Sequence, residues 1–250
     1  MEFIQYDTKD WFKTWFDSPY YEILYKNRNE VEAKLFIDKL IKLLSPNKKS
    51  HFLDLCCGKG RHSRYINSLG YKVDGTDLSE RNINSLIKYN SDKLNFFQSD
   101  MRKLNINNKY EYIFNLFTSF GYFDNIEDDL LVAEKIHNAL KINGIVVIDF
   151  INMIKAIENI QRSQIKKVDN ISFKITKKID DNYLYKNIEF CHKKVEYNFT
   201  EKVKILKQND FIDIFEQKKL KLIESYGDYE LNQFNNKSER LILIFKKLIN

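Results

Sequence analysis

The stretch that decides the fold is Phe52-Leu53-Asp54-Leu55-Cys56-Cys57-Gly58-Lys59-Gly60-Arg61-His62-Ser63. It begins as a short apolar strand, continues through a tight turn with two glycines, and then starts a helix. Gly58 and Gly60 have no Cβ, so a ligand can approach the backbone of this turn closely. Because the turn leads into a helix N-terminus, the sequence predicts a ligand site at the carboxyl end of this first strand.

Short apolar runs alternate with helical patterns on both sides of this turn. The runs typical of buried strands are residues 51–55, 71–76, 94–98, 110–117 and 144–150. Helical periodicity lies between most of them, at 60–69, 79–89 and 127–140, and also before the first, at 9–17 and 29–44. This alternation implies βαβ units and therefore an α/β fold with a doubly wound, mostly parallel sheet and helices on both faces.

After residue 150 the pattern changes to a period of two. Ile171, Phe173 and Ile175 alternate with polar residues, and Asp180-Asp181-Asn182 is typical of a turn. This alternation predicts an antiparallel β insertion after the fifth strand, with one face in contact with solvent.

The remaining chain completes the predicted sheet. A helix is expected near residues 207–218, followed by strands at 219–227 and 239–248, which gives seven strands in all. We therefore divide the chain into three parts. These are the N-terminal helices and core at 1–160, the insertion at 161–206, interpreted as a substrate lid, and the completion of the core at 207–250.

Two other interpretations of the glycine turn stay open. Gly58-Lys59-Gly60-Arg61-His62-Ser63 matches the dinucleotide-binding pattern G-x-G-x-x-G except at its last position. Asp54 opposes this interpretation, because a carboxylate so close to the turn would repel a pyrophosphate but could pair with an ammonium group. The missing third glycine opposes it as well. The other alternative is an ordinary turn without a ligand, which would not need two close glycines after an acid.

The segment Asp54–Ser63 resembles motif I of the class I S-adenosylmethionine (SAM)-dependent methyltransferases, whose usual form is D/E-x-G-x-G-x-G. Cys56 stands in place of the first glycine. The resemblance extends over most of the chain and includes the N-terminal region of small-molecule members such as glycine and sugar N-methyltransferases. It implies a Rossmann-like fold, SAM as cofactor and the activity of a transferase.

The resemblance also implies a set of cofactor-binding residues. Asp77 would accept hydrogen bonds from both ribose hydroxyls, and Asp100 from the adenine amino group. The full implied set is Tyr21, Arg28, Asp54, Cys56, Gly58, Gly60, Asp77, Leu78, Asp100, Met101 and Phe117. Within it, Leu78 and Met101 would lie beside the adenine and Phe117 beneath the methionine portion. Tyr21 and Arg28 would bind the methionine end, because a guanidinium can hold a carboxylate with two hydrogen bonds.

The residues that contact the methyl acceptor are less clearly indicated by the sequence. Transfer of an activated methyl group mainly requires that donor and acceptor are oriented and that water is excluded. Candidates for contact with the acceptor or for catalysis are Tyr20, Tyr122, Asp124 and His192. Asn115-Leu116-Phe117-Thr118 lacks the prolines of the D/N-P-P-Y segment typical of enzymes that methylate amino groups of DNA bases. No cysteine lies between residues 58 and 190 to act as the nucleophile for cytosine C5 methylation.

The composition and the chain's apolar segments indicate the class of protein and its location. With 43% hydrophobic and 14% aromatic residues the chain is typical of a globular protein. The start of the chain lacks a signal-peptide pattern and no run approaches the roughly 18 apolar residues of a membrane span, so a cytoplasmic protein without membrane contact is expected. Three cysteines, two of them adjacent, predict neither a disulfide framework nor a metal site.

The net charge of +6 leaves the class of partner open. Most of the excess lies in the Lys-rich segment 165–207, which is either a solvated β face or a surface for an anionic partner such as RNA. We favour a small-molecule acceptor over nucleic acid and expect a monomer or homodimer. An RNA or protein methyltransferase and a non-catalytic SAM-binding subunit remain as alternatives.

Overall fold

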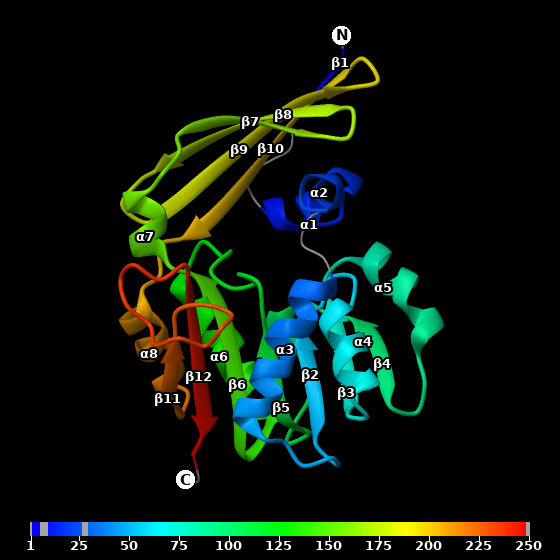
Figure 1. The fold of residues 1–250 in the computed structure, drawn as a ribbon, viewed down its shortest axis with the longest axis vertical. Helices are drawn as coiled ribbons and strands as arrows, with labels where there is room; N and C mark the ends of the chain where they lie inside the picture. Colours follow the sequence, from blue (N-terminus) through cyan, green and yellow to red (C-terminus); the bar gives the residue numbers. More distant parts are fainter. Residues whose placement is uncertain (1, 6–9, 27–29, 249–250) are drawn as a thin grey trace.

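Figure 1 shows the computed structural model, which describes residues 2–5, 10–26 and 30–248. A seven-stranded sheet with helices on both faces forms the larger body, and a five-stranded sheet lies above it. Two short helices of the N-terminal segment lie between the two sheets. The predicted α/β class is confirmed.

The larger sheet has the strand order β11-β12-β6-β5-β2-β3-β4. Its strands are β2 (His51–Leu55), β3 (Lys72–Asp77), β4 (Leu94–Gln98), β5 (Tyr110–Asn115), β6 (Leu140–Ile151), β11 (Leu220–Tyr226) and β12 (Arg240–Lys247). Strands β2 to β6 are parallel, and only β12 and β11 run antiparallel to their neighbours. The strand order reverses at β2, which lies between β3 and β5, and ligands of doubly wound sheets bind at such a reversal.

Helices cover both faces of this sheet and bury one hydrophobic cluster on each. On one face lie α3 (Glu30–Leu44), α4 (Arg61–Ser68) and α5 (Glu80–Leu86), which bury residues such as Phe36, Ile66 and Ile83. On the other lie α6 (Ile126–Ala139) and α8 (Gln208–Glu216), with Ile136 and Phe211. The two clusters explain why the core strands are apolar on both sides.

The smaller sheet contains the predicted antiparallel insertion. After α7 (Met153–Glu158) come β7 (Ser163–Val168), β8 (Ile171–Ile179), β9 (Tyr183–His192) and β10 (Val195–Lys204), in the order β1-β10-β9-β8-β7. The predicted turn follows β8, where Asp180 accepts hydrogen bonds from the backbone N–H groups of Asn182 and Tyr183. The fifth strand, β1 (Glu2–Gln5), was not predicted and pairs parallel with β10.

The N-terminal helices pack against the underside of this smaller sheet (Figure 1). The single helix predicted at 9–17 is α1 (Trp11–Trp15), and α2 (Pro19–Leu24) follows, with Ser18 as its N-cap. Trp15 is fully buried, its ring lies 4.6 Å from that of Phe199, and its indole N–H donates to Glu201 at 2.7 Å. Helices α1 and α2 are thus attached to the insertion.

A buried ion pair joins the insertion to the core. Lys204, at the end of β10, pairs with Asp129 of α6 and donates to the backbone carbonyl of Asn125 at 2.6 Å. Burial raises the pKa of Asp129 to about 6, although the Lys204 ammonium opposes this shift. The pair fixes where β10 leaves the smaller sheet.

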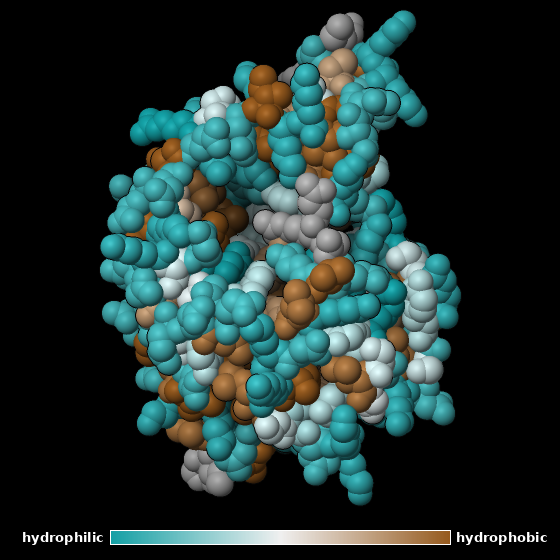
Figure 2. All heavy atoms as spheres, viewed as in Figure 1, coloured by the Kyte–Doolittle hydropathy of each residue, from teal (hydrophilic) through white to brown (hydrophobic). Residues whose placement is uncertain are grey.

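Most of the surface in view is hydrophilic, with hydrophobic side chains scattered over it (Figure 2). Exposed examples are Val31 and Leu35 on α3. Among the residues that the structure describes, no helix combines the length and the apolar character that crossing a bilayer requires.

Candidate active site

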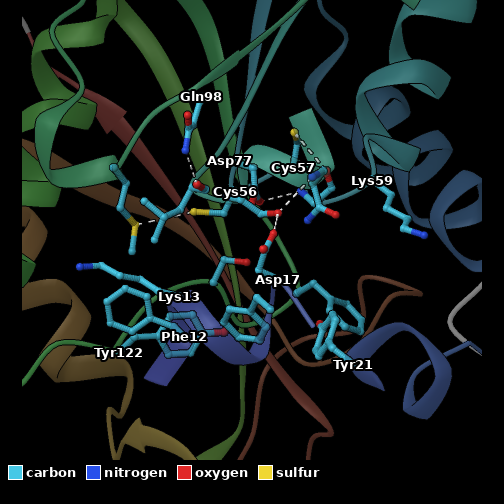
Figure 3. Close-up of a pocket in the computed structure, with 18 of the residues that line it drawn as sticks. Phe12, Lys13, Asp17, Tyr21, Cys56, Cys57, Lys59, Asp77, Gln98 and Tyr122 are labelled. Atoms are coloured by element: carbon cyan, nitrogen blue, oxygen red, sulfur yellow. Dashed lines mark hydrogen bonds between the residues drawn. The ribbon is translucent and has the colours of Figure 1, made fainter. Parts of the chain in front are cut away.

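A cavity of about 740 Å³ lies where the strand order reverses, between α1–α2 and the carboxyl ends of β2 to β5. In Figure 3, Phe12, Tyr21 and Tyr122 lie on one side of this cavity, and Cys56 and Asp77 lie on the other. None of the described residues that line it belongs to the insertion. Helices α1 and α2 cover the cavity and pack against the insertion, whose role as a substrate lid stays a prediction.

The glycine turn between β2 and α4 has three residues in the left-handed region, Cys56 (φ 66°), Gly58 (φ 54°) and Gly60 (φ 67°). Gly58 lines the cavity, and a Cβ added there would meet no other atom within 4 Å. A Cβ on Gly60 would come within 2.9 Å of the Phe96 ring. Gly60 therefore packs against β4 and does not line the cavity, and its contact with the cofactor stays a prediction.

Asp54 also lies outside the cavity wall. It is buried beneath the turn, where its carboxylate accepts hydrogen bonds from the Ser63 hydroxyl at 2.5 Å and the Ser63 backbone N–H at 3.1 Å. Burial raises the pKa of Asp54 to about 6. Asp54 does not line the cavity and instead accepts hydrogen bonds from the first turn of α4, so its contact with the cofactor stays a prediction.

Asp77, at the end of β3, faces the cavity. One carboxylate oxygen accepts from the Gly58 backbone N–H at 2.8 Å, and the other from that of Ser79 at 2.9 Å. Burial raises the pKa of Asp77, whereas these two N–H groups oppose the shift. The side chain is therefore held by the glycine turn and by the start of α5, with Leu78 beside it in the cavity wall.

Asp100 and Met101 follow β4 and also line the cavity. Arg102 donates to the Asp100 carboxylate at 2.7 Å, and this guanidinium lowers the pKa of Asp100 against the effect of burial. The Met101 sulfur lies 3.8 Å from that of Cys56. These residues bring the ends of β2 and β4 to one wall of the cavity.

The loop after β5 supplies Phe117 and Tyr122. Phe117 and Thr118 both have positive φ, at 71° and 59°, and the Phe117 backbone N–H donates to buried Asp149 at 2.8 Å. The Tyr122 hydroxyl donates to the Thr118 carbonyl, and burial raises the pKa of that hydroxyl. The hydrogen bond from Phe117 to Asp149 thus stabilises the conformation of this loop.

Tyr21 of α2 lines the cavity, with ring centroids 5.0 Å from Phe16 and 4.9 Å from Tyr25. Arg28, its predicted partner, lies outside the described residues. Their joint contact with the cofactor remains a prediction.

Three of the four acceptor-side candidates do not line the cavity. The hydroxyl of Tyr20 in α2 lies 2.9 Å from Nδ1 of His192 in β9 of the smaller sheet. Asp124 is exposed and pairs with Lys202 at 2.6 Å. Of the four, Tyr122 alone lines the cavity, and its contact with the acceptor stays a prediction.

Residues that the sequence did not single out close the cavity on the side of α1 and α2. Asp17 accepts a hydrogen bond from the Ser79 hydroxyl, and Glu22 pairs with Lys59 at 2.5 Å and with Arg81 at 2.7 Å. These contacts join the N-terminal segment to the core. No local pattern could have revealed them, because the partners are far apart in the sequence.

We expect Cys56→Gly to change the free energy of unfolding by less than about 1 kcal/mol, since relief of the left-handed conformation offsets the lost side-chain contact. Cys57 is buried and does not have positive φ, so Cys57→Gly should cost about 1–2 kcal/mol. Urea denaturation of both variants measures the difference. Equal losses would show that the conformation of Cys56 carries no cost.

Comparisons with known proteins agree with this architecture. A family described as a methyltransferase domain matches residues 52–144. An uncharacterised methyltransferase of Schizosaccharomyces pombe is 50% identical over 56 residues, which cover 21% of this chain and 39% of the relative. The ubiquinone biosynthesis O-methyltransferase of Rickettsia canadensis is 26% identical over 130 residues, 51% of this chain and 53% of the relative. The matched segments thus span about half or less of these relatives.

A SAM-dependent methyltransferase from Clostridium acetobutylicum has a similar structure, with a TM-score of 0.78 at 16% identity, over 92% of this chain and 96% of that one. At this identity the similarity shows the fold. Residues 52–144 thus match a methyltransferase-domain family, and the fold of the chain is the Rossmann-like fold of this SAM-dependent methyltransferase.

Proposed function

We propose that the protein is a methyltransferase that transfers a methyl group from SAM to a small-molecule acceptor. The observation that carries the proposal is the cavity of about 740 Å³ covered by α1 and α2. Its volume is within the roughly 300–1,000 Å³ of sites for small ligands. The ubiquinone biosynthesis O-methyltransferase among the relatives, named for a small-molecule pathway, supports the same class of acceptor.

The residues of the cavity wall suit the parts of this donor. In this proposal Asp77 accepts hydrogen bonds from the ribose hydroxyls, and Asp100 and Met101 border the adenine. The aromatic rings of Phe16, Tyr21 and Tyr122 line the wall opposite Cys56, where a sulfonium would be attracted to their faces.

When bound, the sulfonium supplies an activated methyl group, which passes to a lone pair of the acceptor as the donor becomes a thioether. The protein has to align the two and exclude water. The Tyr122 hydroxyl donates to the Thr118 carbonyl and has a raised pKa, which makes it a poor base near neutral pH. This favours an acceptor that arrives with its lone pair free.

The geometry gives less support to an RNA or protein acceptor. The Lys-rich insertion contributes none of the described residues that line the cavity, because α1 and α2 lie between them. An insertion that bound RNA would hold it away from Asp77 and Cys56.

Calorimetry with S-adenosylhomocysteine (SAH), the demethylated product, tests the donor site. We expect SAH to bind with a Kd in the micromolar range, about −8 kcal/mol, and NAD not to bind. Methyl-labelled SAM with amine and hydroxyl compounds then tests the acceptor. Binding of NAD in place of SAH would contradict the proposal, as would transfer of label only to RNA or protein. SAH binding without any transfer would favour a non-catalytic subunit.

A further inference from the structure

One carboxylate of the insertion holds both ends of the segment that covers the cavity. Glu201 of β10 does not line the cavity, and its side chain is only 14% exposed. Its Oε1 accepts a hydrogen bond from the indole N–H of Trp15 at 2.7 Å and another from the hydroxyl of Tyr25 at 2.8 Å. Trp15 ends α1 and Tyr25 is the C-cap of α2, so donors from two helices meet at a single oxygen.

The two donors lie on either side of Tyr21 in the chain, and both pack against its ring. The Tyr21 ring centroid is 5.7 Å from that of Trp15 and 4.9 Å from that of Tyr25. Phe16 packs against Tyr21 at 5.0 Å, and Tyr122 packs against Phe16 at 5.4 Å. Phe16, Tyr21 and Tyr122 line the cavity, and we call them the aromatic wall. The position of this wall therefore depends on rings that Glu201 holds.

The contacts of Glu201 are stronger than those that join the same segment to the core. Lys186 lies 3.3 Å from the other oxygen of Glu201, with a side chain that is 15% exposed. Hydrogen bonds to a charged acceptor are roughly twice as strong as those between neutral groups, and low exposure strengthens them further. By contrast, Glu22 pairs with Lys59 and Arg81, which are both exposed, and exposed ion pairs contribute little.

We propose that Glu201 is a positioning residue, which orients the aromatic wall so that its ring faces meet the sulfonium of the donor. Glu201 acts through Trp15 and Tyr25 and touches neither donor nor acceptor. The insertion thus contributes to the site without lining it. This inference rests on the proposed function, since it concerns the same donor.

The experiment compares SAM with SAH by calorimetry, without any acceptor. The two ligands differ only in the methyl group and the positive charge at sulfur, and a ring face attracts the cation. We expect Glu201→Ala to weaken SAM binding roughly three- to thirtyfold, the range of such an interaction. SAH binding should weaken by less than about twofold, because the neutral thioether gains little from the rings.

Two conservative variants test the same contacts more gently. Glu201→Gln keeps an oxygen that can accept from Trp15 and Tyr25, so it should retain much of the preference for SAM. Tyr25→Phe removes one of the two hydrogen bonds but keeps the ring. It should change the ratio of the two affinities in the same direction by a smaller factor, and it decides the question if Glu201→Ala does not fold.

Glu189→Ala is the matched control, because Glu189 of β9 pairs with Lys174 at 2.9 Å and does not line the cavity. It should leave both affinities unchanged. An unaltered ratio of SAM to SAH affinity in Glu201→Ala and in Tyr25→Phe would overturn the inference. Equal weakening of both ligands gives that result and would show a general structural role. If the wild-type protein bound neither SAM nor SAH, the proposed function itself would fail, whatever the variants did.

Discussion

Replacing Asp77 with alanine is expected to weaken SAH binding by about two orders of magnitude. A carboxylate that accepts from two ribose hydroxyls makes two hydrogen bonds to a charged group, each worth roughly 1.5–3 kcal/mol. Because about 1.4 kcal/mol corresponds to a factor of ten, losing both implies a change of roughly a hundredfold or more. Asp77 also orders the glycine turn through the Gly58 N–H, which adds to the effect.

Calorimetry with a second ligand, 5′-methylthioadenosine, checks that the ribose is the part of the donor bound by Asp77. Asp77→Ala should weaken SAH and 5′-methylthioadenosine alike, since both carry the ribose. Asp77→Glu keeps the negative charge and should retain part of the affinity, whereas Asp92→Ala removes an exposed carboxylate away from the cavity and should have no effect. Unchanged SAH affinity in Asp77→Ala would refute the assignment of the ribose to this residue.

The core fold was predictable because its signals are local. A doubly buried parallel strand is a short apolar run, and the turn after β2 needs residues that tolerate positive φ, as Gly58 shows. The antiparallel insertion was equally visible, since β8 buries Ile171, Phe173 and Ile175 and leaves the residues between them more exposed. In each case the sequence pattern that predicts the element lies within that strand or turn itself.

The cavity was only partly predictable, because its walls come from distant segments. Strand β1 has only four residues, too few for a period to be recognised, so the attachment of the N-terminal segment to β10 was missed. Position near a strand end also does not settle orientation: Asp54 and Asp77 both belong to strands of the sheet, but only Asp77 faces the cavity.

Asp149 is expected to be the residue whose loss destabilises the fold most among those that shape the cavity. It is 1% exposed and accepts hydrogen bonds from the Phe117 N–H, from Tyr229 and from the Arg240 guanidinium at 2.8 Å. Asp149→Ala would leave the charge of Arg240 unpaired, at a cost of about 3–5 kcal/mol in the free energy of unfolding. It would also remove the hydrogen-bond acceptor of the Phe117 backbone N–H, which stabilises the positive φ at this residue. SAH binding should therefore weaken. Urea denaturation and calorimetry measure the two effects.

Two further variants distinguish the effect of the unpaired Arg240 charge from the effect on the loop conformation at Phe117. Glu239→Ala removes an exposed ion pair with Lys155 and should cost less than about 1 kcal/mol. Asp149→Leu combined with Arg240→Met removes both buried charges, so much of the stability should return relative to Asp149→Ala. SAH binding should stay weak in this double variant, because the Phe117 N–H still lacks its acceptor. Recovery of both properties together would show that Asp149 acts only by neutralising Arg240 and does not shape the loop beneath the donor.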